Sequence, residues 1–575
     1  MKSNNTYIYI LSLLLAGELF TTSCSDLLTE DPNSYYEKKE IFASEEKAAM
    51  AVTGVYDKLP TLYGYMDMAF PCSDDTYYMS GQTTDKGRRD IAHYKLNSSN
   101  TWVNSVWQGN YTGIERANYT IEGIEGMENY EGDEDLQTLV AEAKYLRALY
   151  AFNLVRYWGD VPFKTTSTNV NKDIYQPRVS RELIYNQIID DLNFAKNHLP
   201  WATAATSPEK ATQGAARGLL MRVLLQRAGY SLQMDGSITR PDDVKRKEYF
   251  EAVIEEWKAF QISKYHDFYP GGYTELFKGF SAGTIDSKES LFEIAFYSAD
   301  GKSGAKGYWG TYIGPSVAQP SIKVTEVSHF MGRASAMFRA VPEWRDFFDV
   351  QEEDEDGTII KGDERRDVMI CNYKFTWDKE AYSHKKVINK SGKDWYPGKW
   401  RREWMPIGYK DPNVTDVNFC YLRYADVVLM AAEAYNETEN TAEAWKLLNS
   451  VRRRAGAREI TTENYQELMK EKVYKLRFIS DSDDAGKFRT ALFWERGFEL
   501  AFEGQRKYDL IRWGIIKDAL SLFGNRSEVN TSTTTAYPAG ENSAAGKNAR
   551  KSLSRWRHRT VRQSLCRKNG RQSSC

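Results

Sequence analysis

The sequence has few residues in any pattern that binds a metal ion. It holds six cysteines and six histidines among 575 residues. No two cysteines form a CxxC pair, and the histidines are scattered without an HxxxH pair. Pairs at such spacings are typical of zinc sites. We therefore expect no metal centre, no cofactor and no disulfide framework.

The chain also lacks an excess of charge of either sign, because its formal net charge is −2. The charge is unevenly placed. Residues 536–575 hold ten Lys or Arg and one acidic residue, whereas residues 1–535 hold 67 basic and 78 acidic residues. An acidic body repels the phosphate backbone of nucleic acids. We therefore expect no nucleic acid as a partner.

No hydrophobic run is long enough to span a membrane. The apolar run from Tyr7 to Ala16 is shorter than the roughly 20 residues that a spanning helix needs. Lys2 precedes this run, and small residues at 21–23 lead to Cys24. This order predicts a secretory signal peptide over residues 1–23, so we expect the rest of the chain outside the cytoplasm.

Cys24 stands where a bacterial lipoprotein carries its lipidated cysteine, although Thr21 occupies a position where leucine is usual. Acyl chains on Cys24 would anchor the protein, since two or more chains give stable membrane attachment. The alternative is an ordinary signal peptide followed by an incidental cysteine. We favour lipidation of Cys24.

Aromatic residues, by contrast, are plentiful, with 37 Tyr, 25 Phe and 15 Trp. Tyr and Trp suit sites that are partly apolar and partly wet. This number of tyrosines predicts an exposed aromatic surface in addition to a core.

Helix signals fill most of the chain. The strongest is 141–163, AEAKYLRALYAFNLVRYWGDVPF, where apolar residues on nearly every side predict a buried helix that ends at Gly159. Further helices are predicted at 44–60, 101–124, 180–200, 211–232, 246–260, 421–437, 441–456 and 491–514. Their lengths and spacing favour a mainly α fold of tetratricopeptide-like helix pairs over an irregular helical bundle.

The middle of the chain has a different character. From about 265 to 415 the helix signals give way to loops rich in Gly, Pro, Lys and aromatic residues. Residues 290–298 alternate weakly and predict a short strand, and residues 351–367 predict an exposed charged loop. We expect an irregular, loop-rich subdomain here.

Four stretches together resemble the SusD/RagB family of Bacteroidetes outer-membrane lipoproteins. They are CSDLLTEDP at 24–32, EAKYLRALYAFNLVRYWGDVPF at 142–163, the helices at 423–456, and RGFELAFEGQRKYDLIRWG at 496–514. The resemblance implies a SusD-like N-terminal helical region, 24–260, and a C-terminal region, 261–535. It also implies a protein anchored through Cys24 in outer-membrane lipid. Such proteins capture glycans, or in some members peptides, as a lid on a SusC-like TonB-dependent transporter.

The resemblance fails at the end of the chain. Family members usually continue with more body sequence, whereas residues 536–575 are basic, have no acidic residue after Glu541 and show no hydrophobic periodicity. We interpret this tail as out-of-frame translation. The alternative is a solvated basic tail that contacts acidic lipid or glycan.

No motif requires catalysis. Residues 279–283 fit GxSxG, but a nucleophile elbow needs a buried strand before the serine and a helix after it, and the flanking residues predict a loop. Asp74 and Asp75 are adjacent, whereas a glycosidase sets its two carboxylates apart, so we expect a solvated loop or a cap. Four charged residues of the last helix predict a structural salt-bridge network: Arg496, Glu499, Arg506 and Asp509.

Sugar binding needs flat aromatic faces for the pyranose rings and polar groups for the hydroxyls. The resemblance places such residues in the early aromatic loops and in the middle region. The candidates are Tyr77, Tyr78, Arg88, Trp102, Asn104, Tyr308, Trp309 and Tyr312. Trp309 lies among glycines, so we expect it to be exposed, whereas Trp107 fits an apolar stripe and is expected in the core. Trp395, Trp400 and Trp404 form an alternative aromatic set.

Four functions remain open from the sequence. The favoured one is a non-catalytic glycan-binding lipoprotein that delivers its ligand to a SusC-like transporter. The others are a peptide-binding lid, an extracellular hydrolase, and a structural lid that binds little itself.

Overall fold

The structure is a computed structural model, and it describes ten stretches of the chain. These are residues 38–66, 70–79, 87–170, 173, 175–297, 306–320, 330–389, 392–406, 412–469 and 482–523. The predicted signal peptide, Cys24 and the tail from 536 lie outside the described residues.

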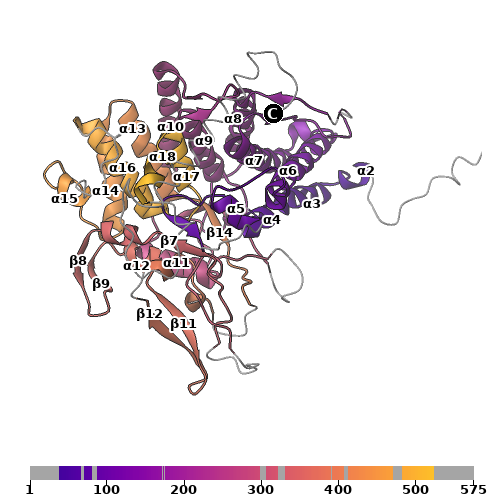
Figure 1. Cartoon of the computed structure of the whole chain (residues 1–575). Coiled ribbons are helices and arrows are strands. Elements are labelled where there is room, and N and C mark those ends of the chain that lie inside the picture. The colour runs from indigo at the N-terminus through magenta and orange to yellow at the C-terminus, as the bar shows by residue number, and fades with distance from the viewer. Residues whose placement is uncertain are drawn as a thin grey trace, which may run out of the picture.

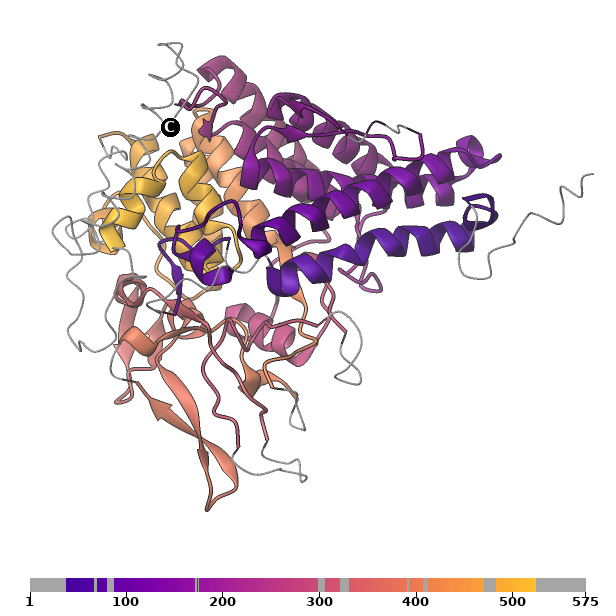
Figure 2. The ribbon, with the colours of Figure 1, turned by 45° about the vertical axis from the view of Figure 1, so that its right-hand side comes forward.

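Helices form the larger part of the described chain, in an N-terminal group and a C-terminal group that lie side by side (Figures 1 and 2). The first group is α2 (Lys38–Ile41), α3 (Glu45–Tyr56), α4 (Lys58–Thr61), α5 (Arg88–Ala92), α6 (Thr101–Glu125), α7 (Glu134–Trp158), α8 (Arg181–His198), α9 (Gln213–Arg227) and α10 (Asp243–Ser263). Later helices are α11 (Gly272–Ala282), α12 (Arg365–Met369), α13 (Tyr424–Glu437), α14 (Thr441–Arg454), α15 (Tyr465–Met469), α16 (Asp484–Leu500), α17 (Arg506–Arg512) and α18 (Ile516–Phe523).

Helix α7 is the buried centre of the first group, as its sequence predicts. Every residue from Tyr145 to Val155 is buried, and both α6 and α8 pack on this helix. Asp133 caps its first turn, and Gly159 ends it with a φ of 74°, in the left-handed region that favours glycine. The predicted buried helix is therefore confirmed, with a start seven residues earlier than predicted.

Each helix packs on the next along the chain from α6 to α10, and α10 then packs on α13 of the C-terminal group. Helix α13 in turn contacts α14 and α16. Layers that contact mainly their neighbours are typical of stacked helix pairs. The fold class predicted from the sequence, mainly α with tetratricopeptide-like pairs, is confirmed.

Short two-stranded sheets lie mostly on the other side of the molecule, where the hairpin of β11 and β12 reaches away from the helices (Figures 1 and 2). Each pair is antiparallel. The strands are β1 (Thr76–Tyr78), β2 (Val161–Pro162), β3 (Arg178–Val179), β4 (Ser231–Leu232), β5 (Ile238–Thr239), β6 (Ser290–Ile294), β7 (Phe338–Ala340), β8 (Val350–Glu353), β9 (Ile359–Gly362), β10 (Ile370–Cys371), β11 (Tyr373–Asp378), β12 (Ser383–Ile388), β13 (Tyr396–Pro397) and β14 (Phe419–Arg423).

Three predicted elements differ from the structure. Residues 351–367 form the hairpin of β8 and β9 followed by α12, rather than one exposed loop, and Arg365 is fully buried. The start of 421–437 is strand β14, which pairs with β6. The stretch 491–514 is two helices, because the chain turns at 501–505 with Phe502 at a φ of 67°.

Candidate functional site

Trp309 is buried, so its predicted exposure is wrong. Its side chain is 4% exposed and stacks on Phe419 with ring centroids 4.2 Å apart. Its indole N–H donates a hydrogen bond of 3.2 Å to the Tyr63 carbonyl. The neighbouring glycines explain the error: Gly310 has a φ of 83°, and a Cβ on Gly314 would lie 2.6 Å from the Gly310 carbonyl oxygen, so glycine is present because the turn is tight.

Tyr78 is a second predicted ligand contact that the structure places in the core. It is 4% exposed, and its ring packs edge-on against Phe338 at 5.2 Å. Side chains alternate between the two faces of a strand, so Tyr77, the preceding residue of β1, points to the other face and is only half-buried. Of this pair only Tyr77 remains a candidate.

Four of the predicted residues meet at one place. The Arg88 guanidinium lies over the Trp102 ring at 5.2 Å and over the Tyr312 ring at 4.9 Å. Tyr308 stacks on Tyr312 with ring centroids 4.6 Å apart and an angle of 24°. All four side chains are half-buried. We call this set, Trp102, Arg88, Tyr312 and Tyr308, the aromatic–arginine ladder.

The first half of the ladder is positioned by the starts of α5 and α6. Arg88 is the first residue of α5 and Trp102 the second residue of α6. Asn100 joins them: its side-chain oxygen accepts from the Trp102 N–H at 3.0 Å, and its amide donates to the Gly87 carbonyl at 3.0 Å. One capping residue therefore fixes both helix starts.

The second half is a tight turn that is tied to the sheet of β1 and β7. The Tyr312 N–H donates to the Tyr308 carbonyl at 3.0 Å, which brings the two rings together. The Tyr312 carbonyl in turn accepts from the Phe338 N–H of β7 at 3.0 Å. Tyr77 lies on β1, the partner strand of β7, and Asn104 is exposed two residues after Trp102.

The alternative aromatic set is not a shared surface. Trp400 is fully buried and lies 4.7 Å from Trp309, whereas Trp395 and Trp404 are half-buried. Trp107 is half-buried and packs edge-on against Trp158 at 5.0 Å, against the main core as predicted.

The two candidate catalytic motifs have structural roles. Residues 279–283 form the end of α11 rather than a strand-to-helix turn, and the buried Ser281 hydroxyl accepts from the Arg401 N–H at 3.3 Å. Asp74 and Asp75 are buried, so their predicted solvation is wrong. Asp74 pairs with Arg506 at 2.9 Å, and Asp75 accepts from the Phe502 N–H at 3.1 Å in the turn between α16 and α17.

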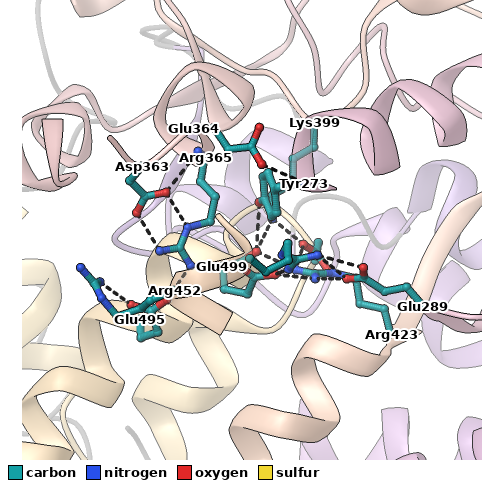
Figure 3. A network of polar contacts seen from close by, with 12 residues as sticks. Tyr273, Glu289, Asp363, Glu364, Arg365, Lys399, Arg423, Arg452, Glu495 and Glu499 are labelled. Atoms are coloured by element: carbon teal, nitrogen blue, oxygen red, sulfur yellow. Dashed lines mark hydrogen bonds and ion pairs between the residues drawn. The ribbon is translucent and has the colours of Figure 1, made fainter. Parts of the chain in front are cut away.

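The predicted salt bridges of the last helices are confirmed and belong to larger buried clusters, of which Figure 3 shows the one around Glu499. Arg496 pairs with Asp509 at 2.7 Å and with Asp426 at 2.8 Å. Glu499 pairs with Arg423 at 2.6 Å and with Arg365 at 3.0 Å. Arg365 extends the second cluster to Asp363 at 2.7 Å and to Glu495 at 2.5 Å.

Mutual pairing keeps these buried groups charged. Burial alone would raise the pKa of Glu499, but Arg454, Arg423 and Arg365 hold it well below its usual range. Burial would likewise raise the pKa of Asp426, and the neighbouring arginines lower it to about 2. These clusters join distant parts of the chain and contribute to the fold rather than to a binding surface.

Two kinds of site are not found in the part of the chain that the structure describes. No three or more His, Cys, Asp or Glu side chains there are grouped so that they could hold a metal ion. Within the same residues, no helix combines the length and hydropathy that crossing a membrane requires.

Two family models match the chain. The model described as "SusD family" matches residues 282–564, and the model described as "Starch-binding associating with outer membrane" matches residues 26–225. The first match extends into the basic tail. Together they cover most of the sequence.

Individual proteins and solved structures that resemble the chain carry the same family description. A SusD-like protein of Formosa agariphila is 24% identical over 546 residues, which are 90% of this chain and 92% of the relative. A SusD homolog from Bacteroides thetaiotaomicron is 28% identical with a TM-score of 0.69, over 84% of this chain and 89% of that chain. A laminarin-binding SusD-like protein shares the fold at 22% identity, with a TM-score of 0.59 over 85% of this chain and 95% of that one.

The stacked helix pairs, the loop-rich subdomain and these matches along both halves of the sequence lead to one conclusion. The chain belongs to the SusD/RagB family.

Proposed function

We propose that this protein is a non-catalytic, surface-exposed lipoprotein that binds glycans at the aromatic–arginine ladder and delivers them to a SusC-like TonB-dependent transporter. The observation that carries the proposal is the meeting of Trp102, Arg88, Tyr312 and Tyr308 at a half-buried surface. Relatives support it, because one solved structure is a surface glycan-binding protein A from Bacteroides thetaiotaomicron in complex with laminarihexaose.

The ladder has both components that carbohydrate recognition needs. Half-buried aromatic rings present apolar surface to the C–H faces of a pyranose. The guanidinium beside the rings is the type of group whose N–H donates to sugar oxygens. Because the rings and the guanidinium support each other, the surface is ordered before the ligand arrives, which lowers the entropic cost of binding.

The charges near the ladder favour binding over hydrolysis. A glycosidase needs two carboxyl groups that flank the scissile bond. The segments 87–105 and 306–320, which carry the ladder, contain a single acidic residue, Asp90, and it is buried. We therefore assign no catalytic residue, and we expect no release of reducing ends when the protein is incubated with polysaccharides.

Affinity gels with starch, laminarin and other glycans, run with the purified full chain in detergent, test the binding role. We expect at least one glycan to retard the wild-type protein. Trp102→Ala and Tyr308→Ala should each lower the affinity for that glycan about tenfold or more, which corresponds to about 1.4 kcal/mol of binding free energy. Tyr175→Ala, which removes a tyrosine that is 86% exposed before β3, is the matched control. Equal affinity of the wild-type protein and the three variants would show that the ligand binds elsewhere.

Attachment through Cys24 is tested separately in cells. A protein with Cys24→Ala should leave the membrane fraction and lose labelling by palmitate, whereas the wild-type chain stays with outer-membrane vesicles and carries the label. Membrane retention of the unlabelled variant would contradict a lipid anchor at Cys24.

A further inference from the structure

A cavity of about 40 Å³ lies between α7, β14 and the turn at 501–505. Arg156 of α7, Tyr421 of β14 and Gln505 of the turn contribute to its wall. One water molecule needs roughly 10–15 Å³ of such space, so the cavity admits a species of a few atoms and excludes a sugar ring. None of the four residues of the ladder lines it, so it is a separate site.

Two residues of this wall carry a buried polar atom that has no hydrogen-bond partner in the described part of the chain. In Tyr421, which is 2% exposed, the atom is the hydroxyl oxygen. In Arg156 it is Nε, which is buried although the residue as a whole is half-buried. Buried polar groups are almost always hydrogen-bonded, because an unpaired one loses its hydration without compensation. The two atoms therefore indicate a species bound in the cavity.

Two more such atoms surround Tyr421. The Arg222 guanidinium lies over the Tyr421 ring at 4.9 Å, and its Nε has no partner among the described residues. The hydroxyl of the fully buried Tyr145 is in the same situation. Burial, and then the charge interaction with Tyr421, raise the pKa of Tyr145, so these two hydroxyls are neighbours. Arginine N–H groups only donate, so the missing partner is an acceptor.

Arg156 is also a cation without a matching anion. The charged cluster beside it is balanced, with three arginines on three carboxylates: Arg222, Arg496 and Arg512 on Asp426, Asp509 and Glu433. Arg156 instead donates to two amide oxygens, Gln505 Oε1 and Asn153 Oδ1, each at 3.3 Å. Within the described residues no carboxylate pairs with it. One positive charge is therefore left over at the cavity.

The two carboxylates that do line the cavity are held by other groups. Asp75 accepts from the Ser73 hydroxyl at 3.0 Å and from the Phe502 N–H at 3.1 Å. Glu503 accepts from the Arg423 Nε at 2.8 Å. Neither is within ion-pair distance of Arg156, so neither supplies the acceptor that its Nε lacks.

Tyrosine hydroxyls are instead the electrostatic neighbours of Arg156. Burial lowers the pKa of its guanidinium, but nearby tyrosines, Tyr421 foremost, raise it above its ordinary value. Arg156 therefore stays charged, and the Tyr421 hydroxyl lies close to it. A single small acceptor between them would satisfy both orphaned atoms.

We propose that this cavity binds a chloride ion, which accepts hydrogen bonds from the Nε of Arg156 and from the hydroxyl of Tyr421. A monatomic anion suits the size of the cavity, accepts from several donors at once, and supplies the negative charge that Arg156 lacks. The ion would join the N-terminal helices to β14 and to the turn before α17. This site goes beyond the proposed glycan-binding function and does not depend on it.

Crystals of the full chain soaked in sodium bromide test the site directly, because bromide replaces chloride and scatters anomalously. We expect an anomalous peak within hydrogen-bond distance of Arg156 Nε and of the Tyr421 hydroxyl. Ordered density there without an anomalous signal would mean that water satisfies the donors, and the inference would be wrong.

Thermal melting tests the site in solution. Sodium chloride is compared with sodium gluconate at equal ionic strength, since gluconate is too large for the cavity. A ligand that binds only the folded protein stabilises it, so saturating chloride should raise the Tm by about 1–3 °C over gluconate. A bromide peak in crystals without this shift would mean binding at crystal concentration only, and would overturn the inference.

Three variants assign the shift to the cavity. Tyr421→Phe removes one hydroxyl and keeps the ring, and Arg156→Gln removes the charge. The first should reduce the chloride-dependent shift and the second should abolish it, whatever their own Tm in gluconate. Lys258→Gln, which removes an exposed cation on α10, is the control and should keep the full shift. A shift of the same size in all three variants would show a general salt effect and contradict a site at Arg156.

Discussion

At Trp102 the indole packs against a guanidinium at a half-buried surface, whereas at Trp309 it packs against both Phe419 and Trp400 in the core. The two tryptophans therefore contribute to different properties of the molecule. Trp102 contributes to the binding surface, and Trp309 contributes to the free energy of unfolding through burial and close packing.

Replacing Trp309 by alanine should therefore lower stability. We expect Trp309→Ala to reduce the free energy of unfolding by about 3–5 kcal/mol, since it leaves a cavity among aromatic rings. Trp102→Ala should cost clearly less, because its ring is only partly buried. Urea unfolding followed by fluorescence measures both. A larger loss in Trp102→Ala than in Trp309→Ala would contradict the assignment of these two side chains.

Asp75 is a buried carboxylate whose ionisation opposes folding. Burial, and then the charge of Asp74, raise the pKa of Asp75 to about 6. The unfolded value is about 3.9. Because the folded pKa is the higher one, the contribution of Asp75 to stability is complete below about pH 4 and is lost as the pH rises through 6.

Asp75→Asn keeps an oxygen that accepts the Phe502 N–H but cannot ionise. We expect the variant and the wild-type protein to have similar stability near pH 4. Near pH 7 the variant should be more stable, by about 3 kcal/mol at most. Urea unfolding between pH 4 and 7.5 measures the difference, and a difference that does not change with pH would show that the carboxyl does not titrate in this range.

For the candidate ligand-binding residues, the sequence predicts the type of side chain better than it predicts whether that side chain is exposed. Arg88, Tyr308 and Tyr312 are recognisable as aromatic or hydrogen-bonding types in loop-rich stretches and Trp102 at the start of a predicted helix, and these four do meet. The burial of Trp309 and Tyr78 was not predictable, because it depends on which face of a turn or strand meets β7 and β14. A glycine-rich turn reads the same in a sequence whether it is exposed or tightly packed.

At the scale of elements, two glycines in helix interiors have opposite roles. A Cβ on Gly113 of α6 would lie 2.5 Å from the Tyr150 ring of α7, so glycine there permits the two helices to approach. Gly54 of α3 has nothing within 4 Å of such an atom. Glycine costs roughly 0.5–1 kcal/mol relative to alanine inside a helix.

The two alanine variants should therefore differ in sign. Gly54→Ala should raise the free energy of unfolding by about 0.5–1 kcal/mol, whereas Gly113→Ala should lower it by about 1–3 kcal/mol through overpacking. Thermal melting compares them under one condition. Stabilisation by both substitutions would mean that α6 and α7 are less closely packed than the structure shows.

Elements with a strong local signal were predictable, and those set by distant partners were not. Helix α7 follows from its residues, its Asp133 cap and its Gly159 stop. Strand β14 exists because β6 pairs with it, and the turn at 501–505 is held by Asp75 of an early loop. Neither partner is evident from the local sequence. Arg365, within a run of charged residues, pairs with its neighbour Asp363, but its burial also depends on Glu495 and Glu499 from the distant α16.

At the scale of the whole molecule, the cluster around Glu499 joins segments from distant parts of the chain. Its partners Arg365, Arg423 and Arg454 come from α12, β14 and α14. A buried ion pair contributes little beyond an apolar contact, but loss of one partner leaves the others uncompensated. The cluster therefore makes the loop-rich subdomain and the C-terminal helices depend on one another.

Neutralising Glu499 tests that dependence. Glu499→Gln should lower the free energy of unfolding by about 3–5 kcal/mol, because three arginines lose a shared carboxylate. Glu255→Gln, which breaks an exposed pair with Lys258 on α10, is the matched control and should have a much smaller effect. Chemical denaturation followed by circular dichroism measures both, and similar effects of the two substitutions would contradict a buried, coupled cluster.

The central claim is that this member of the SusD/RagB family holds a glycan at the aromatic–arginine ladder. A crystal structure of the full chain with an oligosaccharide of the polymer that it binds tests this most directly. The account predicts a pyranose ring in contact with Trp102 or Tyr308 and ligand oxygens within hydrogen-bond distance of Arg88. An oligosaccharide bound at another surface, with the ladder empty, would contradict it.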